Sequence, residues 1–352
     1  MFSKGVFLLD IEVELAWGIM TSPTRTKMNA KILEEAARKI RGRLENILEV
    51  LEKYQISTTW SILGHVLLDM CERNSNSKLP HPDMPRPNYK WGKKDWYWFD
   101  PCKTIGEEPA FYGKDIVDRI IDFTSKAKVE HEIACHSFSH PIFGDINCSE
   151  EVAEAEVKKC IHLLKESYSI LPKVFIFPRN SPGYLNVLRR NGIEVFRGPI
   201  PHTISYSESE KGLANSLRKY SSLALQFLSF YMKTSPPLVM PTTEQGMVNI
   251  PASLCYSKPS FVPLRLVITK AKKGIQMAVK NKKIFHLFTH DINFGIEADF
   301  NKFFEGFEEI LQFAYKCWGK DELELTTMGA VAKSFQEDYC LSGEVCDEGC
   351  LP

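Results

Sequence analysis

Short apolar segments alternate with amphipathic helical segments along most of the 352-residue chain, and this alternation restricts the fold more than any other feature. Residues 6–9 predict a buried strand, residues 29–54 a long helix and residues 56–63 a second strand. The order recurs downstream, with predicted strands at 132–134, 173–177, 192–198, 283–291 and 323–327 and predicted helices at 114–126, 149–167, 184–190, 264–280, 300–315 and 328–335. A repeated strand–helix–strand order favours a parallel sheet or barrel, so we expect an α/β fold.

Two stretches lack this alternation and are interpreted as insertions, residues 72–112 and residues 201–262. The first is rich in proline and carries an aromatic run made of Trp91, Trp96, Tyr97, Trp98 and Phe99. Long loops with exposed aromatic residues are often functional, so these rings either bind a sugar or pack the insertion onto the domain. The second contains a predicted amphipathic helix at 213–232, for which we expect core packing, with a lid or a membrane-surface element as alternatives.

The length and the cysteines predict the domain organisation and the compartment. We expect a single domain over residues 1–339, followed by a C-terminal tail at 340–352. Three cysteines of the tail could hold a metal or a disulfide, although we expect a loose terminus: Cys340, Cys346 and Cys350. The ten cysteines form no CxxC pair, which suits reduced thiols in a cytoplasm.

Charge and hydropathy exclude several classes of function. The chain carries 44 Lys and Arg against 44 Asp and Glu, so no overall field favours binding to a nucleic acid polymer. No apolar run approaches the ~18 residues that would span a bilayer. The first residues lack the long apolar region and cleavage site of a signal peptide, and we interpret them as the first strand. We therefore expect a cytoplasmic protein.

Three acidic residues, Asp10, Glu12 and Glu14, follow the first predicted strand directly and alternate with apolar residues. The alternation of a strand places the three carboxylates on one side, at the strand end where ligands bind in α/β sheets and barrels. A carboxylate that follows a buried strand is costly to bury unless it has a role. These acids are therefore candidates for a functional site.

Histidines recur at a spacing of four residues. His136 and His140 would lie on one side of a helical turn, where both can face one metal ion. Nine histidines in 352 residues give about 0.2 such pairs by chance, yet the chain has a second pair, His286 and His290. Arg179 follows the predicted strand at 173–177, where a guanidinium could hold a carboxylate through two hydrogen bonds.

Together these separated motifs resemble those of the polysaccharide deacetylase family (NodB homology, carbohydrate esterase family 4), over roughly residues 4–335. The segment His136–His140 resembles the metal motif H-[ST]-x-x-H of that family. Phe177–Asn180 resembles its F-P-R-N arginine motif, and Phe285–His290 resembles its late strand with a catalytic histidine. Val248–Ser253 resembles a branch of the family that acts in surface-polysaccharide synthesis.

The resemblance implies a distorted (β/α) barrel of NodB type with two insertions, and a metal-dependent hydrolysis of N-acetyl groups on sugars. It implies that His136 and His140 bind the metal, usually Zn²⁺, together with one of the early carboxylates. A second early carboxylate would act as general base, Arg179 would hold that base in place, and His290 would protonate the departing amine. Zn²⁺ lowers the pKa of a bound water to about 7, and an imidazolium can give its proton to nitrogen near neutral pH.

The early carboxylates allow two alignments with the family motif. The gapless match of residues 14–18 to the D-x-E-L-x-W-G form makes Glu12 the base and Glu14 the metal ligand, and we adopt this register. The alternative takes Asp10 as the base and needs a two-residue shift. For the substrate-binding residues we predict Trp17, Trp96, Trp98 and His286.

The expected substrate is an N-acetylated sugar, a nucleotide-sugar or a lipid-linked saccharide, the last of which would bring peripheral contact with a membrane. Two other functions stay open. Some relatives with Glu in the acidic motif work without metal and open cyclic amides, and a degenerate barrel could bind a glycan through the aromatic residues 91–99. Both histidine pairs and Arg179 count against a binding module, which needs none of them.

Overall fold

The computed structural model describes residues 2–21, 28–71, 73, 79–89, 95–201, 213–232, 234–259, 262–296 and 299–341. Trp91 and residues 342–352 of the predicted tail lie outside this range, as do residues 202–212 of the second predicted insertion.

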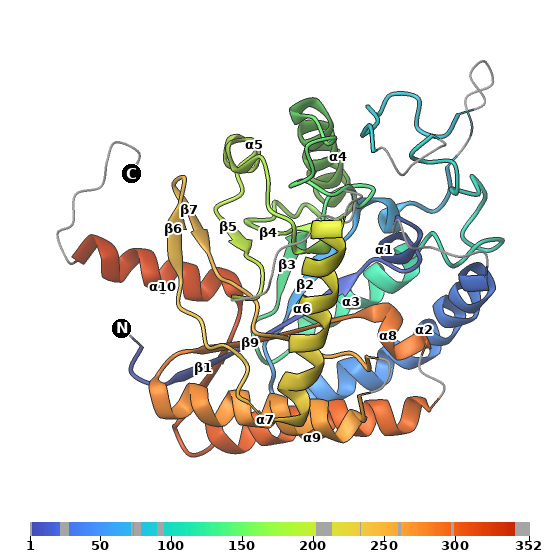
Figure 1. Ribbon diagram of the computed structural model, residues 1–352. Coiled ribbons are helices and arrows are strands. Elements are labelled where there is room, and N and C mark those ends of the chain that lie inside the picture. Colours follow the sequence, from blue (N-terminus) through green and yellow to red (C-terminus); the bar gives the residue numbers. More distant parts are fainter. Residues whose placement is uncertain are drawn as a thin grey trace.

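A curved sheet of mostly parallel strands forms the centre of the molecule (Figure 1). Its strands are β1 (Gly5–Val13), β2 (Thr59–Ile62), β3 (Glu132–Cys135), β4 (Val174–Ile176), β5 (Val195–Arg197), β6 (Thr242–Glu244), β7 (Met247–Asn249), β8 (Leu254–Cys255), β9 (Ile284–His290) and β10 (Leu323–Thr326). The order across the sheet is β6-β7-β5-β4-β3-β2-β1-β9-β8, and β10 also pairs with β1. The β6–β7 hairpin is antiparallel, whereas the other pairs of these strands are parallel.

Helices surround this sheet (Figure 1). They are α1 (Trp17–Met20), α2 (Met28–Lys53), α3 (Lys114–Lys126), α4 (Glu150–Tyr168), α5 (Leu185–Arg190), α6 (Leu213–Tyr231), α7 (Leu264–Asn281), α8 (Asp291–Ile296), α9 (Phe300–Trp318) and α10 (Met328–Leu341), with 3₁₀ turns at Gly64–Leu67 (η1) and Pro178–Asn180 (η2). The predicted α/β fold, a distorted barrel of NodB type, is confirmed. Within the described residues no helix is long and apolar enough to cross a membrane.

The two faces of β1 pack into different apolar clusters. Phe7 and Leu9 belong to the larger cluster, which lies between the sheet and the surrounding helices. Val6 and Leu8 belong to a smaller cluster formed by side chains of β3, β4, β5, β7 and β9 together with the start of α10. Since alternate residues of a strand point to opposite faces, this smaller cluster lines the inner side of the curved sheet.

The second predicted insertion is shorter than residues 201–262. Its C-terminal part supplies β6, β7 and β8, and β7 continues the sheet beyond β5. These strands are two or three residues long and stand next to prolines, Pro241 and Pro251, so they lack the apolar pattern that predicts longer strands.

Helix α6 lies largely on the surface, so the core packing expected for residues 213–232 is wrong. Large apolar side chains along it are exposed: Leu213, Leu217, Tyr220, Leu223, Leu225, Phe227, Leu228 and Tyr231. The C-terminal end is held, because Phe230 is buried and Ser229 accepts hydrogen bonds from Lys270 of α7. A helix with an apolar pattern buries that face only where a neighbour covers it, and the pattern alone does not supply the neighbour.

Glu132, the first residue of β3, allows a test of how a buried carboxylate affects the stability of the fold. Its carboxylate accepts hydrogen bonds from Thr59 Oγ1 at 2.9 Å and from the Gly329 amide at 3.1 Å, yet burial raises its pKa from about 4.5 to about 7. Between these values the folded protein binds a proton that the unfolded chain releases, so the group lowers stability as pH rises through this window. We expect Glu132→Gln to be more stable than wild type at pH 8 by about 1–3 kcal/mol and equal to it at pH 4.5, as measured by urea unfolding. Equal stability at both pH values would contradict this.

Candidate active site

Polar and charged side chains continue the inner face of the sheet beyond its apolar layer. On β1, Asp10 and Glu12 follow Val6 and Leu8 at the two-residue spacing of a strand. The same spacing links Ala134 to His136 after β3, Val195 to Arg197 on β5 and Ile284 to His286 on β9. Because these strands are parallel, acids, imidazoles and a guanidinium meet at one end of the barrel, where ligands bind in this class of fold.

Glu14 lies between the two histidines of the H-[ST]-x-x-H segment. Its Oε2 is 3.3 Å from His136 Nε2 and 3.0 Å from His140 Nε2. All three side chains are buried, and their ligand atoms lie close enough together to hold one metal ion. The structure thus brings together the three residues predicted as metal ligands.

The two histidines meet through a loop, so the expected helical turn is wrong. The segment follows β3, and Ser137 and His140 both have left-handed φ angles, 63° and 66°. Glu156 of α4 accepts hydrogen bonds from two backbone amides of this loop, at 2.9 and 2.6 Å. These amides bond to a side chain in place of a helical carbonyl, and the loop folds back so that His136 and His140 face the same point.

Hydrogen bonds on the far side of each ring fix which nitrogen faces the site. His136 Nδ1 lies 2.7 Å from the carbonyl oxygen of Ile176, which can only accept, so Nδ1 carries the proton. His140 Nδ1 lies 2.8 Å from Thr21 Oγ1, whose own proton goes to the carbonyl of Trp17 at 2.6 Å. His140 Nδ1 is therefore also a donor. In the neutral imidazoles both Nε2 atoms then carry a lone pair that faces a carboxylate. A cation bound between these three groups would remove the repulsion between them.

Glu12 stands beside this group with one oxygen held and one directed to the site. Its Oε1 accepts a hydrogen bond from Arg197 Nη2 at 2.8 Å, and its Oε2 lies 3.4 Å from His136 Nε2 and 3.6 Å from His290 Nε2. Burial disfavours the charged form of His290, but Glu12 and Glu14 outweigh it and hold its pKa well above the usual value. Likewise the histidines overcome burial and keep the pKa of Glu14 well below its usual value.

Asp10 has both oxygens engaged away from the metal-binding group. Arg197 Nη1 donates to Oδ1 at 2.7 Å, and His286 Nε2 lies 2.7 Å from Oδ2. All three side chains are buried. Burial alone would raise the pKa of Asp10, but the two cationic or hydrogen-bonding partners lower it below the ordinary value. Asp10 is thus a buried anchor for Arg197 and His286.

The guanidinium that holds the acids belongs to Arg197 and not to Arg179, which we predicted for this position. Arg197 bridges the two acids of β1 and also donates to Asn180 Oδ1, at 2.6 Å from Nη2. Arg179 instead donates to the carbonyl of Gly18 at 3.2 Å. A charged residue within an otherwise apolar strand, as in Val195–Arg197, was the sequence signal that could have identified it.

The predicted substrate-binding residues lie in different environments. Trp17 and His286 are fully buried, so the direct sugar contact predicted for them is wrong. Trp96 is nearly buried and donates through Nε1 to Ser139 Oγ at 2.8 Å, which makes it a support of the histidine loop. Trp98 is exposed, so its ring is accessible to a sugar, as the predicted contact requires.

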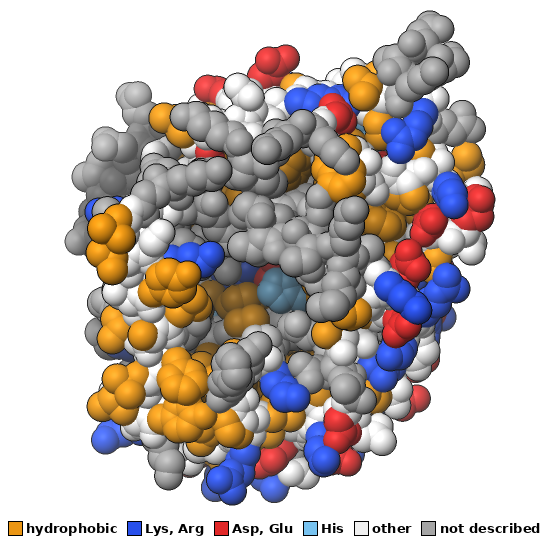
Figure 2. Space-filling model, turned by 45° about the vertical axis from the view of Figure 1, so that its right-hand side comes forward, with side chains coloured by type: hydrophobic (Ala, Val, Ile, Leu, Met, Phe, Trp, Pro, Cys, Tyr) orange, Lys and Arg blue, Asp and Glu red, His pale blue; other side chains and the backbone are white. Residues whose placement is uncertain are grey.

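The site opens to the surface beside His290. The other histidines of the site are buried, whereas the His290 side chain is 27% exposed. On the face shown in Figure 2, a recess in the surface has a histidine side chain at its floor, with apolar side chains beside it. His290 is therefore the histidine of this group that solvent can reach.

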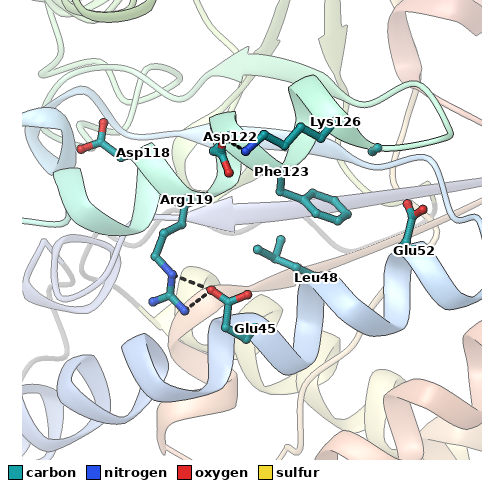
Figure 3. A pocket seen from close by; sticks show the side chains of 9 residues that line it. Glu45, Leu48, Glu52, Asp118, Arg119, Asp122, Phe123 and Lys126 are labelled. Atoms are coloured by element: carbon teal, nitrogen blue, oxygen red, sulfur yellow. Dashed lines mark hydrogen bonds and ion pairs between the residues drawn. The ribbon is translucent and has the colours of Figure 1, made fainter.

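A hollow of about 540 Å³ lies elsewhere, between α2 and α3 (Figure 3). Its charged residues already have partners: Arg119 bonds to Glu45 and Lys126 to Asp122, while Asp118 and Glu52 pair with Lys114 and Lys128 outside the hollow. Phe123 and Leu48 form its apolar wall. None of the three groups of potential metal ligands found among the described residues lies in it.

Gly18 offers a test of the metal-binding geometry. A Cβ atom at this position would lie 1.9 Å from Glu14 Oε1, so Gly18→Ala must displace the carboxylate from the two histidines. We expect the affinity for Zn²⁺ to fall by about 10–100-fold, as measured by competition with a chelator. Gly42→Ala on α2 is the matched control, because a Cβ atom there meets nothing within 4 Å. Unchanged affinity in Gly18→Ala would show that Glu14 does not bind the metal.

Comparisons with known proteins find relatives only by structure. No family model and no curated protein sequence matches the chain. It is similar to the crystal structure of a protein from Mycobacterium smegmatis assigned as a polysaccharide deacetylase, with a TM-score of 0.55 and 12% identity over 99% of this chain and 96% of that one. It is also similar to a 4-α-glucanotransferase from Thermococcus litoralis, with a TM-score of 0.52 and 13% identity over 94% of this chain and 40% of that one.

These likenesses establish the fold. The two structures carry different reactions on related scaffolds, so the reaction of this chain has to be argued from the residues of its site. The curled sheet and the surrounding helices match the NodB-type deacetylase fold.

Proposed function

We propose that the protein is a metal-dependent hydrolase that removes N-acetyl groups from a saccharide. The observation that carries this proposal is the convergence of Glu14 Oε2 with two histidine Nε2 atoms, whose protons are held on the opposite side of each ring. Two imidazole nitrogens and one carboxylate oxygen are the three protein ligands of a catalytic Zn²⁺ site, which keeps its fourth position open. When bound, the metal would acidify a water molecule and polarise the acetyl oxygen.

Glu12 is the general base in this proposal. Its Oε2 faces His136 and His290 across the site, while Arg197 fixes the other oxygen at 2.8 Å. Asp10 is unsuited to the role because Arg197 and His286 occupy both of its oxygens. The gapless alignment of the acidic motif, with Glu12 as base and Glu14 as ligand, fits these contacts better than the shifted one.

His290 is the proton donor to the departing amine. Glu12 and Glu14 raise its pKa above the usual value, which favours the imidazolium form, and its side chain is partly exposed. A positioned acid of this kind commonly contributes about 10²–10⁴-fold to a rate. Base and acid thus face the same site, with Glu12 Oε2 and His290 Nε2 3.6 Å apart.

The test is acetate release from a panel of UDP-linked and lipid-linked N-acetyl sugars. We expect release by the zinc-loaded protein, and its loss in Glu12→Gln with full retention of zinc. A protein that binds no metal and opens a cyclic ureide without releasing acetate would instead be the metal-independent hydrolase. A protein that binds a glycan without turnover would be a binding module, in which Glu12→Gln leaves affinity unchanged.

The surface helix α6 favours a lipid-linked saccharide as the substrate, which the protein would meet on the cytoplasmic face of a membrane. Large exposed apolar surfaces commonly have a binding role, α6 exposes large apolar side chains along its length, and Arg218 adds an exposed cationic side chain to the same helix. In sedimentation with anionic phospholipid vesicles, we expect the double variant Leu217→Glu and Leu225→Glu to lose at least about 10-fold in affinity. Leu171→Glu, at an equally exposed leucine before β4, is the control. Equal binding by all proteins would exclude α6 as the contact.

A further inference from the structure

A second cluster of metal-binding side chains lies apart from the proposed active site. It consists of His65, Cys71, His81 and Asp100. His65 belongs to η1, directly after β2, whereas the other three come from the long loop region between η1 and α3. His65 and Asp100 are fully buried and His81 nearly so.

The donor atoms surround one point. His65 Nε2 lies 3.1 Å from His81 Nε2, and both nitrogens lie within 3.0 Å of Asp100 Oδ2. Cys71 Sγ lies 3.1 Å from the same oxygen. Around a tetrahedral Zn²⁺, with bonds of about 2.0 Å to nitrogen or oxygen and about 2.3 Å to sulfur, neighbouring ligand atoms are about 3.3–3.5 Å apart. The observed separations differ from these by a few tenths of an ångström.

With both imidazoles neutral, hydrogen bonding does not satisfy this cluster. His65 Nδ1 lies 3.3 Å from the carbonyl oxygen of Phe111, which can only accept, so the proton of the neutral ring belongs on Nδ1. His65 Nε2 then carries a lone pair that faces the Asp100 carboxylate. A single proton on His81 Nε2 cannot be donated to both His65 Nε2 and Asp100 Oδ2. A cation between the four atoms removes the conflict.

The outer contacts orient the ligands toward that point. Asp100 Oδ1 accepts from Tyr112 Oη at 2.9 Å and from the Cys102 amide at 3.0 Å, which leaves Oδ2 for the cluster. His81 and Cys102 both have left-handed φ angles, 46° and 49°. Non-glycine residues adopt this conformation at a cost, and such strain is concentrated where side chains must be aimed.

We propose that His65, Cys71, His81 and Asp100 form a second, structural Zn²⁺ site. This inference goes beyond the proposed function and does not depend on it. Four protein ligands close a tetrahedral site, so the ion would have no open position for a substrate and would act on the fold. It would tie the described residues between η1 and α3, which form no helix and no strand of the main sheet, to the end of β2.

The site would also support the active site. The His65 ring packs against Trp17, with ring centroids 4.1 Å apart, and Trp17 stands three residues after Glu14. From the same loop region, Trp96 holds Ser139 of the histidine loop. Loss of the structural ion would therefore loosen the surroundings of the catalytic ligands without removing any of them.

Metal analysis of the full-length protein, purified under reducing conditions and loaded with Zn²⁺, separates the two sites. We expect about two zinc ions per chain in wild type and about one each in His136→Ala, Cys71→Ser and His81→Ala. The ion kept by His136→Ala should bind one sulfur, seen by X-ray absorption as a scatterer at about 2.3 Å. Only nitrogen and oxygen scatterers in that variant would overturn the proposal, and this measurement needs no change to the cluster itself.

Substitution with Co²⁺ gives a second readout that does not involve activity. A sulfur-to-cobalt charge-transfer band should appear in wild type and in His136→Ala and should vanish in Cys71→Ser. Cys255→Ser is the control, since this cysteine neighbours His290 in the active site. A band that persists in Cys71→Ser, or a disulfide between Cys71 and Cys102, whose sulfurs lie 3.3 Å apart, in metal-free protein, would overturn the proposal.

Discussion

Replacing His136 by alanine is expected to abolish zinc binding at the active site and to lower acetate release by about 10³-fold or more. The reason is geometric, because His136 and His140 supply two of the three ligand atoms around Glu14, and a carboxylate with one imidazole holds Zn²⁺ poorly. A loss of 10³-fold corresponds to about 4 kcal/mol of transition-state stabilisation, within what a metal supplies when it polarises a carbonyl.

The control for this variant is His162→Ala, which changes an exposed histidine on α4. It should keep wild-type metal content and wild-type rate. Acetate release in His136→Ala at the wild-type rate would mean that the chemistry does not pass through this site. If circular dichroism shows that His136→Ala does not fold, Glu14→Gln takes its place. This variant keeps the shape of the ligand side chain, removes its charge and should lose zinc and activity in the same way.

Replacing Arg197 by alanine is expected to destabilise the fold by about 3–5 kcal/mol. The fully buried guanidinium bonds to Asp10 at 2.7 Å and to Glu12 at 2.8 Å, and its carbon lies over the Phe288 ring at 4.2 Å. Removal of one partner from a buried ion pair leaves an uncompensated charge, and here two carboxylates lose their partner. Urea unfolding at pH 7 measures the difference in the free energy of unfolding.

Two comparisons make the result specific. Arg179→Ala should cost clearly less, since Arg179 does not bridge the two acids of β1. Adding Asp10→Asn to Arg197→Ala should recover part of the loss, because it removes one of the two stranded charges. If Arg179→Ala were the more damaging change, the assignment of Arg197 to the acids would be wrong.

The active-site ligands were accessible from the sequence because they occupy fixed places relative to strands. Glu12 lies on β1 and Glu14 follows the strand at the same two-residue spacing, and His136 comes two residues after Ala134 on the inner face of β3. Alternation in a strand is local, so it can be read from a single chain. The four-residue spacing of His136 and His140 was interpreted as a helical turn, which is wrong, yet the prediction that both rings face one site is correct.

What the sequence did not reveal depends on contacts between distant segments. Arg197 reaches Asp10 across 187 residues, and no local spacing links them. The second metal cluster draws its ligands from positions 65, 71, 81 and 100, and these intervals match no spacing motif. The exposure of α6 has the same origin, because an amphipathic pattern states which face is apolar and not whether another element covers it.

We propose that one metal ion, held by Glu14, His136 and His140, is required for the hydrolysis of an N-acetyl group, with Glu12 as the general base. The most direct test of this proposal is acetate release from a lipid-linked N-acetyl saccharide by wild type and Glu12→Gln, with zinc quantified in each sample. The account predicts release by wild type, loss on removal of the metal with recovery on its return, and at least about 10²-fold slower release by Glu12→Gln at equal zinc content. Release at the same rate from metal-free protein, or from Glu12→Gln, would contradict it.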